Sequence, residues 1–294
     1  MLRIEDFLNY LLLERNSSLL TLKSYSGDLK EFQLFFKTIE KSLTWEVIDS
    51  DLVRDWIESM MDKGMKATSV NRKLSALRTF YRYALKRKLV QNDPTYGIQG
   101  PKREKPLPQF LKESEVNELL DSKEWTDDYN SVLARTIILT FYTTGVRLAE
   151  LVGLDDSDVD FDLRELKVTG KRNKQRIIPF GDELYMALKA YMRKRDEEID
   201  KKSAAIFLSE KGKRVARSQI YAMVRQSLSS VSTLQKRSPH VLRHTFATAM
   251  LNHDAGLESV KKLLGHERLT TTEIYTHTTF EQLKEVYKHA HPRA

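Results

Sequence analysis

The sequence predicts a mainly α-helical protein of two domains, with a small antiparallel β-sheet in the second domain. Three observations support this fold class. Apolar residues recur at helical spacing through most of the first hundred residues. A stretch rich in Gly, Pro and charged residues follows at 97–108 and is typical of a linker. Further along, two short β-type runs flank a turn-like segment at 170–175. We therefore expect a helical domain at 1–96 and a larger domain at 109–294.

Four helices account for the first domain. Apolar stripes over 4–11 and 22–39 predict the first two helices, and Thr21 is a suitable N-cap for the second. A third helix is expected at about 51–61 and a fourth at about 69–85. Together they predict an all-helical domain.

The second domain begins with helices and then changes pattern. A long helical stripe through 132–141 is expected to end at Gly145. The runs 166–168 and 177–179 predict the two strands of a β-hairpin, and 206–208 is the expected third strand. The remainder returns to helical spacing.

Composition excludes several kinds of chemistry. The chain of 294 residues has no cysteine, which excludes disulfides, a thiolate nucleophile and thiolate metal sites. Its first 16 residues contain acidic side chains and only a short leucine run, unlike a signal peptide or a membrane span. From these observations we expect a cytoplasmic protein that does not bind membranes.

The positive charge is concentrated in one part of the chain. Lys and Arg number 49 against 41 Asp and Glu, a net charge of +8. Residues 66–105 contain eleven basic and two acidic residues, so the rest of the chain sums to −1. Within the fourth helix, the basic residues that fall on one side are Arg72, Arg78, Arg82 and Lys86. A solvated face is the alternative, but the scarcity of nearby carboxylates favours a DNA-binding surface.

The segment 238–248 contains two histidines and an arginine at the start of a predicted helix. Ser238 is a plausible N-cap, and Pro239 suits the first helical position. His240 and Arg243 lie three residues apart, so they share a helix face near N–H groups that favour an anion. His240 and His244 could instead bind a metal ion.

Five segments of the second domain occur in an informative order: 144–151, 170–176, 240–243, 264–266 and 272–275. Together they resemble the tyrosine recombinase family, and within it the bacterial Xer recombinases. The resemblance spans essentially the whole chain. It implies a helical SAM-like core-binding domain followed by a tyrosine-recombinase catalytic domain. It also implies that the tail, at 279–294, docks into a neighbouring protomer.

The resemblance assigns a role to each matching position. The implied catalytic residues are Arg147, Lys171, His240, Arg243, His266 and the nucleophile Tyr275. Tyr275 would attack a scissile phosphate clamped by the two arginines and form a 3′-phosphotyrosyl link, because nearby cations stabilise both phenolate and transition state.

The other implied roles are supporting ones. Lys171, in the hairpin, would protonate the leaving 5′-oxygen, with Lys174 as the second choice. His266 would donate a hydrogen bond to the phosphate, and His240 would assist proton transfer. Glu150 would orient the basic cluster.

The resemblance also implies partners. The expected DNA contacts are Arg72, Arg78, Arg82, Lys86, Arg172 and Lys174. The expected assembly is a homo-tetramer, or a hetero-tetramer with a paralogue, on double-stranded recombination sites, with a DNA translocase as a further candidate partner. Exchange of one phosphodiester for another requires neither ATP nor a metal ion, so no cofactor is expected.

Several alternatives stay open. A type IB topoisomerase-like enzyme would use the same catalytic set, and a catalytically inactive DNA-binding protein is a second alternative. Tyr287 is a competing nucleophile, although its stripe with Phe280 and Leu283 indicates packing. A zinc site from His240, His244 and His266 is disfavoured by the arginine among them. The target DNA sequence, the partner and the choice among chromosome-dimer resolution, integration and inversion are left undecided.

Overall fold

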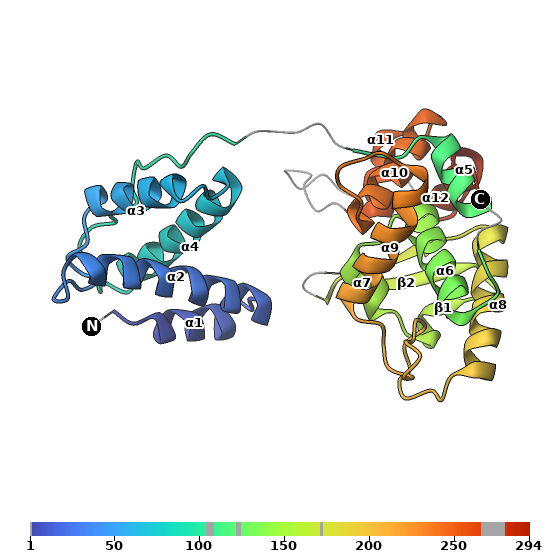
Figure 1. The fold of residues 1–294 in the computed structure, drawn as a ribbon, viewed down its shortest axis with the longest axis horizontal. Coiled ribbons are helices and arrows are strands. Elements are labelled where there is room, and N and C mark those ends of the chain that lie inside the picture. Colours follow the sequence, from blue (N-terminus) through green and yellow to red (C-terminus); the bar gives the residue numbers. More distant parts are fainter. Residues whose placement is uncertain (1, 104–108, 122–124, 171–172, 266–279) are drawn as a thin grey trace. The chain divides into compact units, whose positions relative to one another are not determined.

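The computed structural model describes residues 2–103, 109–121, 125–170, 173–265 and 280–294. The chain divides into two compact units, residues 1–106 and 107–294, and each is considered by itself (Figure 1). The predicted fold class is confirmed, because the described residues are mainly helical with one three-stranded antiparallel sheet. The exact domain bounds expected from the sequence stay a prediction. No helix among the described residues is long and apolar enough to cross a bilayer.

The first unit is built from four helices around an aromatic core. They are α1 (Ile4–Leu13), α2 (Leu19–Ile39), α3 (Ser50–Asp62) and α4 (Ala67–Lys86). Trp45, in the segment between α2 and α3, is buried against Phe80 of α4, with ring centroids 4.6 Å apart. The N-cap expected at Thr21 is wrong. Ser18 caps α2, because its extended backbone lets its hydroxyl accept from the N–H of Thr21 (3.2 Å).

The second unit surrounds one central helix. Its helices and strands are α5 (Glu113–Asp121), α6 (Tyr129–Thr144), α7 (Leu148–Gly153), η1 (Asp156–Asp158), β1 (Val159–Asp160), β2 (Glu165–Thr169), β3 (Gln175–Pro179), α8 (Asp182–Glu198), α9 (Arg217–Val231), α10 (Pro239–Asn252), α11 (Leu257–Leu264) and α12 (Phe280–Ala290). In Figure 1, α6 lies between α8 and α9, and it also packs against α10. Because α6 is buried on nearly every side, its end firmly supports the turn at Gly145 that leads into α7.

The sheet has the order β1-β2-β3, and both pairings are antiparallel. The predicted hairpin is confirmed: Leu166 of β2 pairs with Ile178 of β3, and both side chains are buried. The third strand was expected at 206–208, which is wrong. The short strand β1 occupies that edge instead.

Side chains and backbone groups outside the sheet satisfy the backbone of 206–208. The N–H of Ile206 donates to the carbonyl oxygen of Leu154 (3.1 Å), and the N–H of Val215 donates to that of Phe207 (3.0 Å). Tyr129 donates from its hydroxyl to the carbonyl oxygen of Leu208 (2.8 Å), and the N–H of Leu208 donates to the hydroxyl of Tyr191 (3.0 Å). Arg195 donates to the carbonyl oxygen of Ile206 (2.8 Å). Because these backbone groups find partners outside β1, β2 and β3, the segment has no need to join the sheet.

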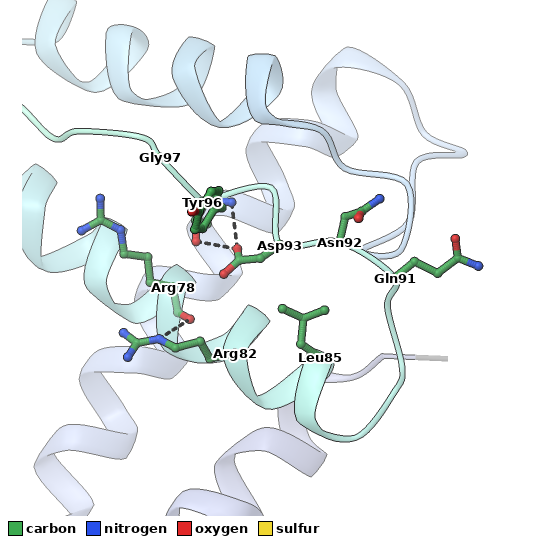
Figure 2. A pocket seen from close by; sticks show the side chains of 9 residues that line it. Arg78, Arg82, Leu85, Gln91, Asn92, Asp93, Tyr96 and Gly97 are labelled. Atoms are coloured by element: carbon green, nitrogen blue, oxygen red, sulfur yellow. Dashed lines mark hydrogen bonds between the residues drawn. The ribbon is translucent and has the colours of Figure 1, made fainter.

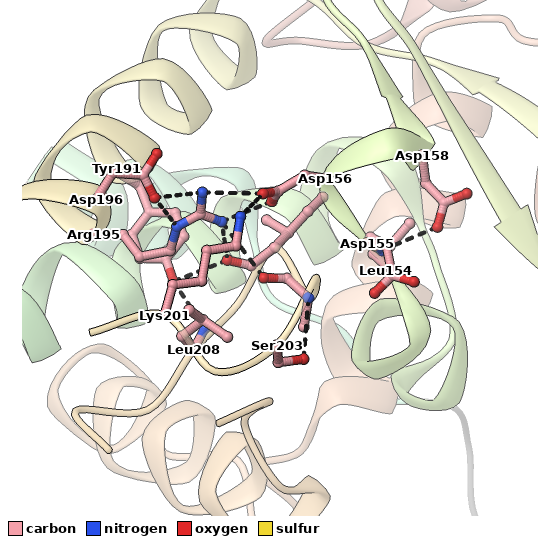
Figure 3. Close-up of polar contacts among 12 residues, drawn as sticks. Leu154, Asp155, Asp156, Asp158, Tyr191, Arg195, Asp196, Lys201, Ser203 and Leu208 are labelled. Carbon is pink, nitrogen blue, oxygen red and sulfur yellow. Dashed lines mark hydrogen bonds and ion pairs between the residues drawn. The ribbon is translucent and has the colours of Figure 1, made fainter. Parts of the chain in front are cut away.

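Arg195 is the centre of a buried ion cluster (Figure 3). Its side chain is 1% exposed, and it pairs with Asp156 (Nη1–Oδ1, 2.7 Å) and Asp196 (Nη2–Oδ1, 2.7 Å). Lys201 pairs with Asp156 as well. Two carboxylates and the Ile206 carbonyl thus compensate the buried guanidinium. The cluster ties the end of α8 to the turn before β1.

We predict that Gly145→Ala destabilises the protein by about 1–3 kcal/mol. Gly145 ends α6 with φ +59°, and an added Cβ would meet the Phe246 ring and lie 2.8 Å from Cδ2 of Leu264. Denaturant unfolding measures the effect. Gly153→Ala is the matched control, because its Cβ would enter open space. Equal stability of the two variants would contradict the role given to Gly145.

Candidate active site

The left-handed turn at Gly145 places Arg147 at the start of α7. The expected end of the long helix at Gly145 is confirmed. Arg147 has an extended backbone, and its N–H donates to Oε2 of Glu150 (2.8 Å). Its guanidinium also donates from Nη1 to Oε1 of Glu150 (2.8 Å). The carboxylate of Glu150 therefore binds both the backbone N–H and the guanidinium of Arg147.

Glu150 is shared with a second arginine. Its side chain is 2% exposed, and Arg176 of β3 donates to both of its oxygens, Nη1 to Oε1 (2.7 Å) and Nη2 to Oε2 (3.0 Å). Burial by itself would raise the pKa of Glu150. The hydrogen bonds from Arg176 and Arg147 outweigh burial and lower the pKa to about 2. The carboxylate is thus ionised throughout the physiological range.

Three arginines converge on the last carbonyl groups around the end of α11. Arg176 donates from Nε to the carbonyl oxygen of Leu263 (2.9 Å). Arg243 donates from Nη2 to that of Leu264 (2.7 Å), and Arg147 from Nη2 to that of Gly265 (2.9 Å). These carbonyls lack partners within the helix and form the negative end of its dipole. Three consecutive oxygens therefore bring β3, α10 and α7 to one point.

Arg243 is the most buried of the three arginines. It also donates from Nη1 to the carbonyl oxygen of Gly145. Burial lowers the pKa of Arg243 to about 10, the charges of Arg147 and Arg176 act in the same direction, and Glu150 opposes them. At neutral pH the guanidinium is still charged. Three cations beside one carboxylate leave an excess of positive charge that an anion would relieve.

The histidines of the 238–248 segment lie at the start of α10. Ser238 precedes the helix and Pro239 is its first residue, but the Ser238 side chain makes no capping hydrogen bond. His240 and His244 are both exposed. Partial burial, His240 and Arg243 all lower the pKa of His244. Both imidazoles are therefore accessible, His240 about one turn before the buried Arg243 and His244 next to it in the chain.

Four predicted site residues lie outside the described residues: Lys171, Arg172, His266 and Tyr275. The structure does describe their flanks. The N–H of Gly170 donates to the carbonyl oxygen of Lys174 (2.7 Å), so residues on the two sides of 171 and 172 are bonded to each other. Lys174 itself is exposed. Gly265, with φ +63°, immediately precedes His266. Among the described residues, no three His, Asp or Glu side chains form a group that could hold a metal ion.

Arg176 was absent from the residues that sequence reasoning assigned to the site. Its position at the far end of the hairpin motif was visible, but a basic residue in a strand carries no distinguishing signal. Its role depends on Glu150 and Leu263, which are 26 and 87 positions away. The structure brings it into direct contact with the group around Arg147.

The basic residues of α4 have unlike surroundings. Arg72 pairs with the buried Asp28 of α2 and donates to the hydroxyl of Ser24 (2.6 Å). Arg78 donates to the carbonyl oxygen of Ile98, and the exposed Arg82 donates to that of Arg78 (3.3 Å). Within 2–103, neither Arg78 nor Arg82 pairs with a carboxylate. The count of charged residues within 66–105 did not include Asp28, which lies in α2, outside that stretch. The count therefore overstated the free positive charge at Arg72.

Arg78 and Arg82 line a groove of about 700 Å³ on the first unit (Figure 2). The segment after α4 forms its other wall and includes Tyr96, which is 87% exposed. Asp93 also lines the groove, but its carboxylate accepts from the N–H and the hydroxyl of Thr95 (2.8 and 2.6 Å). The groove therefore presents two guanidinium groups and an exposed aromatic ring.

The tail packs against its own unit in this chain. Tyr287 of α12 is buried, and its ring stacks on His291 at a centroid distance of 5.3 Å. Burial lowers the pKa of His291 to about 4, so the neutral ring donates from Nε2 to the carbonyl oxygen of Tyr142 (3.1 Å). Arg293 pairs with Asp121 (2.6 Å) and Glu183 (2.8 Å). The last residues are thus held by stacking and by two carboxylates.

Two family models together match most of the chain. Residues 109–282 match the phage integrase family, and residues 4–88 match the phage integrase N-terminal SAM-like domain. The chain belongs to the phage integrase family. The sequence predicted a tyrosine site-specific recombinase of the Xer type. The relatives that match this chain confirm that enzyme class.

Those relatives match over nearly their whole lengths. The tyrosine recombinase XerC of Pelotomaculum thermopropionicum is 37% identical, over 99% of this chain and 98% of its own. XerD of Staphylococcus haemolyticus is 35% identical, over 99% of each chain. The solved post-cleavage complex of the XerH site-specific recombinase with palindromic difH substrate has a TM-score of 0.71 at 22% identity. It covers 94% of this chain and 78% of that chain, and it shows the shared fold.

We predict that Glu150→Gln costs about 2–4 kcal/mol of stability at pH 7. The lowered pKa means that the ionised carboxylate stabilises the fold above its unfolded pKa of about 4.5, and that this contribution is lost as the pH falls towards 2. The stability gap to the wild type should therefore narrow between about pH 5 and pH 2. Denaturant unfolding across pH measures the gap, and the exposed Glu118→Gln is the control. A gap that is independent of pH would contradict this assignment.

Proposed function

We propose that this protein cleaves and rejoins DNA strands through a 3′-phosphotyrosyl intermediate at Tyr275, as a site-specific recombinase. The observation that carries the proposal is the convergence of Arg147 and Arg243 beside the end of α11. A scissile phosphate placed there would relieve their excess positive charge. Planar guanidinium groups suit the non-bridging oxygens of a phosphodiester and the charge that develops on them during attack.

The proposed reaction exchanges one ester for another. The Tyr275 oxygen forms a bond to phosphorus as the bond to the 5′-oxygen breaks, and Lys171 gives that oxygen a proton. His266 donates to the phosphate, and His240 assists transfer of the tyrosine proton. Attack by a 5′-hydroxyl of another strand reverses the chemistry. The energy of the phosphodiester is retained in the intermediate, so neither ATP nor a metal ion takes part.

The surroundings of Tyr287 support the choice of Tyr275. Tyr287 is 2% exposed, and burial raises the pKa of its hydroxyl above the ordinary value. A buried phenol with a raised pKa is a poor nucleophile, and DNA could not reach it without displacing α12. Tyr287 therefore acts in packing.

DNA is the proposed partner of both units. Arg78, Arg82 and Lys86 of α4 would contact phosphates, while Arg172 and Lys174 would do so from the hairpin. Arg72 is already compensated by Asp28 and would contribute less. The XerH complex contains a DNA substrate, which supports DNA as the ligand of this shared fold.

The assembly we propose is a tetramer on two DNA sites, cytoplasmic, of identical subunits or with a paralogue. The tail contacts made by Tyr287, His291 and Arg293 within one chain are of a kind that a neighbouring subunit could reproduce. Identities of 37% and 35% to XerC and XerD proteins favour neither one. The candidate roles are chromosome-dimer resolution, with a DNA translocase as candidate partner, and integration or inversion of a DNA element.

The sequence left two alternatives, a type IB topoisomerase-like enzyme and an inactive DNA-binding protein, and the confirmed enzyme class favours a recombinase over both. Exchange of strands between two duplexes would distinguish a recombinase from a topoisomerase. Formation of a covalent adduct would exclude an inactive binder.

We predict that Tyr275→Phe binds DNA like the wild type but forms no covalent adduct on a nicked site. Only the nucleophilic oxygen is lost. Denaturing gel electrophoresis of labelled DNA measures the adduct. Tyr287→Phe is the matched control and should retain adduct formation. An adduct in Tyr275→Phe that disappears in Tyr287→Phe would transfer the role to Tyr287.

A second prediction concerns the salt dependence of DNA binding. Arg82→Gln should reduce the slope of log Kobs against log salt by about 1, because one phosphate contact is lost. Arg72→Gln should change the slope less, since Asp28 already pairs with that charge. Binding titrations at several salt concentrations measure both. Equal effects of the two variants would argue against the exposed end of α4 as the contact surface.

A third prediction tests the tail. Arg293→Ala removes the pairs with Asp121 and Glu183, so it should weaken pairing of two DNA sites while binding of one site persists. Native gels with one and two sites separate these steps. The exposed Lys288→Ala, on α12 five residues before Arg293, is the control. Normal two-site assembly by Arg293→Ala would remove these contacts from the assembly mechanism.

A further inference from the structure

We propose that Arg176 is a positioning residue for strand cleavage. It neutralises the charge of Glu150 and thereby keeps Arg147 available for the phosphate. The inference rests on the proposed function. It concerns a residue that does not itself contact the phosphate and acts through Arg147.

All three nitrogens of the Arg176 guanidinium are engaged within the protein. Nη1 and Nη2 donate to the two oxygens of Glu150, and Nε donates to the carbonyl oxygen of Leu263. The side chain is 17% exposed. Such a two-pronged contact with a carboxylate is a geometry that arginine makes and lysine does not. Arg176 is therefore turned towards Glu150, and each of its three guanidinium nitrogens makes a hydrogen bond within the protein.

Arg147 is held differently. Its side chain is 35% exposed. Its Nη1 donates to a carboxylate oxygen of Glu150, and its Nη2 donates to the carbonyl oxygen of Gly265. Without Arg176, Arg147 would be the one cation among the described residues that forms an ion pair with Glu150, and more of the charge of Glu150 would act on it. Attraction between a buried carboxylate and a lone arginine would then compete with the phosphate for that arginine. With Arg176 present, the carboxylate is already satisfied, and Arg147 retains most of its positive charge.

Arg176 also packs against Gly265, the residue that precedes His266. A Cβ added to Gly265 would be 3.1 Å from Cδ of Arg176 and 3.2 Å from its Nε. Removing the Arg176 side chain would take away the support of this turn. The same residue thus links β3 to the turn at Gly265, which precedes His266.

The chain offers a matched control for a merely structural arginine. Arg214 donates to the carbonyl oxygens of Val152 (2.6 Å) and Leu154 (3.1 Å) and to a carboxylate oxygen of Asp155 (2.5 Å). It therefore makes the same kinds of contact as Arg176, one carboxylate and helix-end carbonyls, but none with Glu150 or Arg147.

The test is a double-mutant cycle in single-turnover cleavage. The full chain, at a concentration that saturates a nicked DNA site, forms a covalent adduct whose rate is measured for Arg176→Ala, Arg147→Ala and the double variant. Arg176→Lys keeps a charge next to Glu150 with less disturbance of folding. Thermal unfolding and DNA affinity are measured for every variant. Arg214→Ala is carried through the same cycle with Arg147→Ala.

The expected result is a loss of cleavage on the order of 10- to 100-fold in Arg176→Ala, less than the loss from removing a direct donor. The double variant should cleave no more slowly than Arg147→Ala alone, within about threefold, because Arg176 acts through Arg147. Arg176→Lys should recover part of the rate. Arg214→Ala should lower thermal stability and show no such coupling to Arg147→Ala.

Other outcomes overturn the proposal. If Arg176→Ala and Arg176→Lys both cleave at the wild-type rate, Arg176 does not position the site. If the losses in the double variant multiply, Arg176 acts independently of Arg147. If Arg214→Ala couples to Arg147→Ala as strongly, the effect is general destabilisation. A wild type that forms no adduct overturns the proposed function itself, together with this inference.

Discussion

The carbonyl end of α11 is the constraint on which the catalytic unit depends. Leu263, Leu264 and Gly265 present three consecutive oxygens, and each accepts from a different arginine. Those arginines come from β3, α10 and α7. Guanidinium groups this close repel one another, and the buried Glu150 and the negative helix end offset the repulsion. A small set of polar contacts thus joins, at one point, three elements that also contribute to the same hydrophobic core.

This arrangement prepares the unit for an anion before any anion arrives. Gly145 turns the chain between α6 and Arg147, and its carbonyl oxygen accepts from Arg243. Arg243 is buried and charged, with its pKa lowered to about 10. Donors that are already oriented need little rearrangement when negative charge develops on a phosphate, and this is the largest contribution to many enzymatic rates. The fold tolerates three arginines close together because each guanidinium has backbone or carboxylate acceptors.

Local sequence pattern was sufficient where local contacts decide the structure. The hairpin at 166–179 and the helix end at Gly145 follow from alternation and from a glycine that adopts positive φ. The local pattern failed where residues far apart in the sequence determine the structure. The third strand was misplaced because side chains of α6 and α8 and the backbone of Leu154 and Val215 satisfy the backbone at 206–208. The pairing of Arg72 with Asp28 spans 44 positions, and Arg176 reaches Leu263 across 87. For Tyr275, Lys171 and His266, the family resemblance still carries the assignment.

The most direct measurement of the central claim is a structure of the protein with nicked DNA and vanadate. Vanadate joined to a tyrosine oxygen and a 5′-oxygen reproduces the five-coordinate geometry of the transition state. We predict that Arg147 and Arg243 contact the equatorial oxygens, Tyr275 occupies one apical position, and Arg176 remains on Glu150 and Leu263. An Arg176 that contacts vanadate, or an Arg147 that stays on Glu150 away from it, would contradict the proposed division of roles between these arginines.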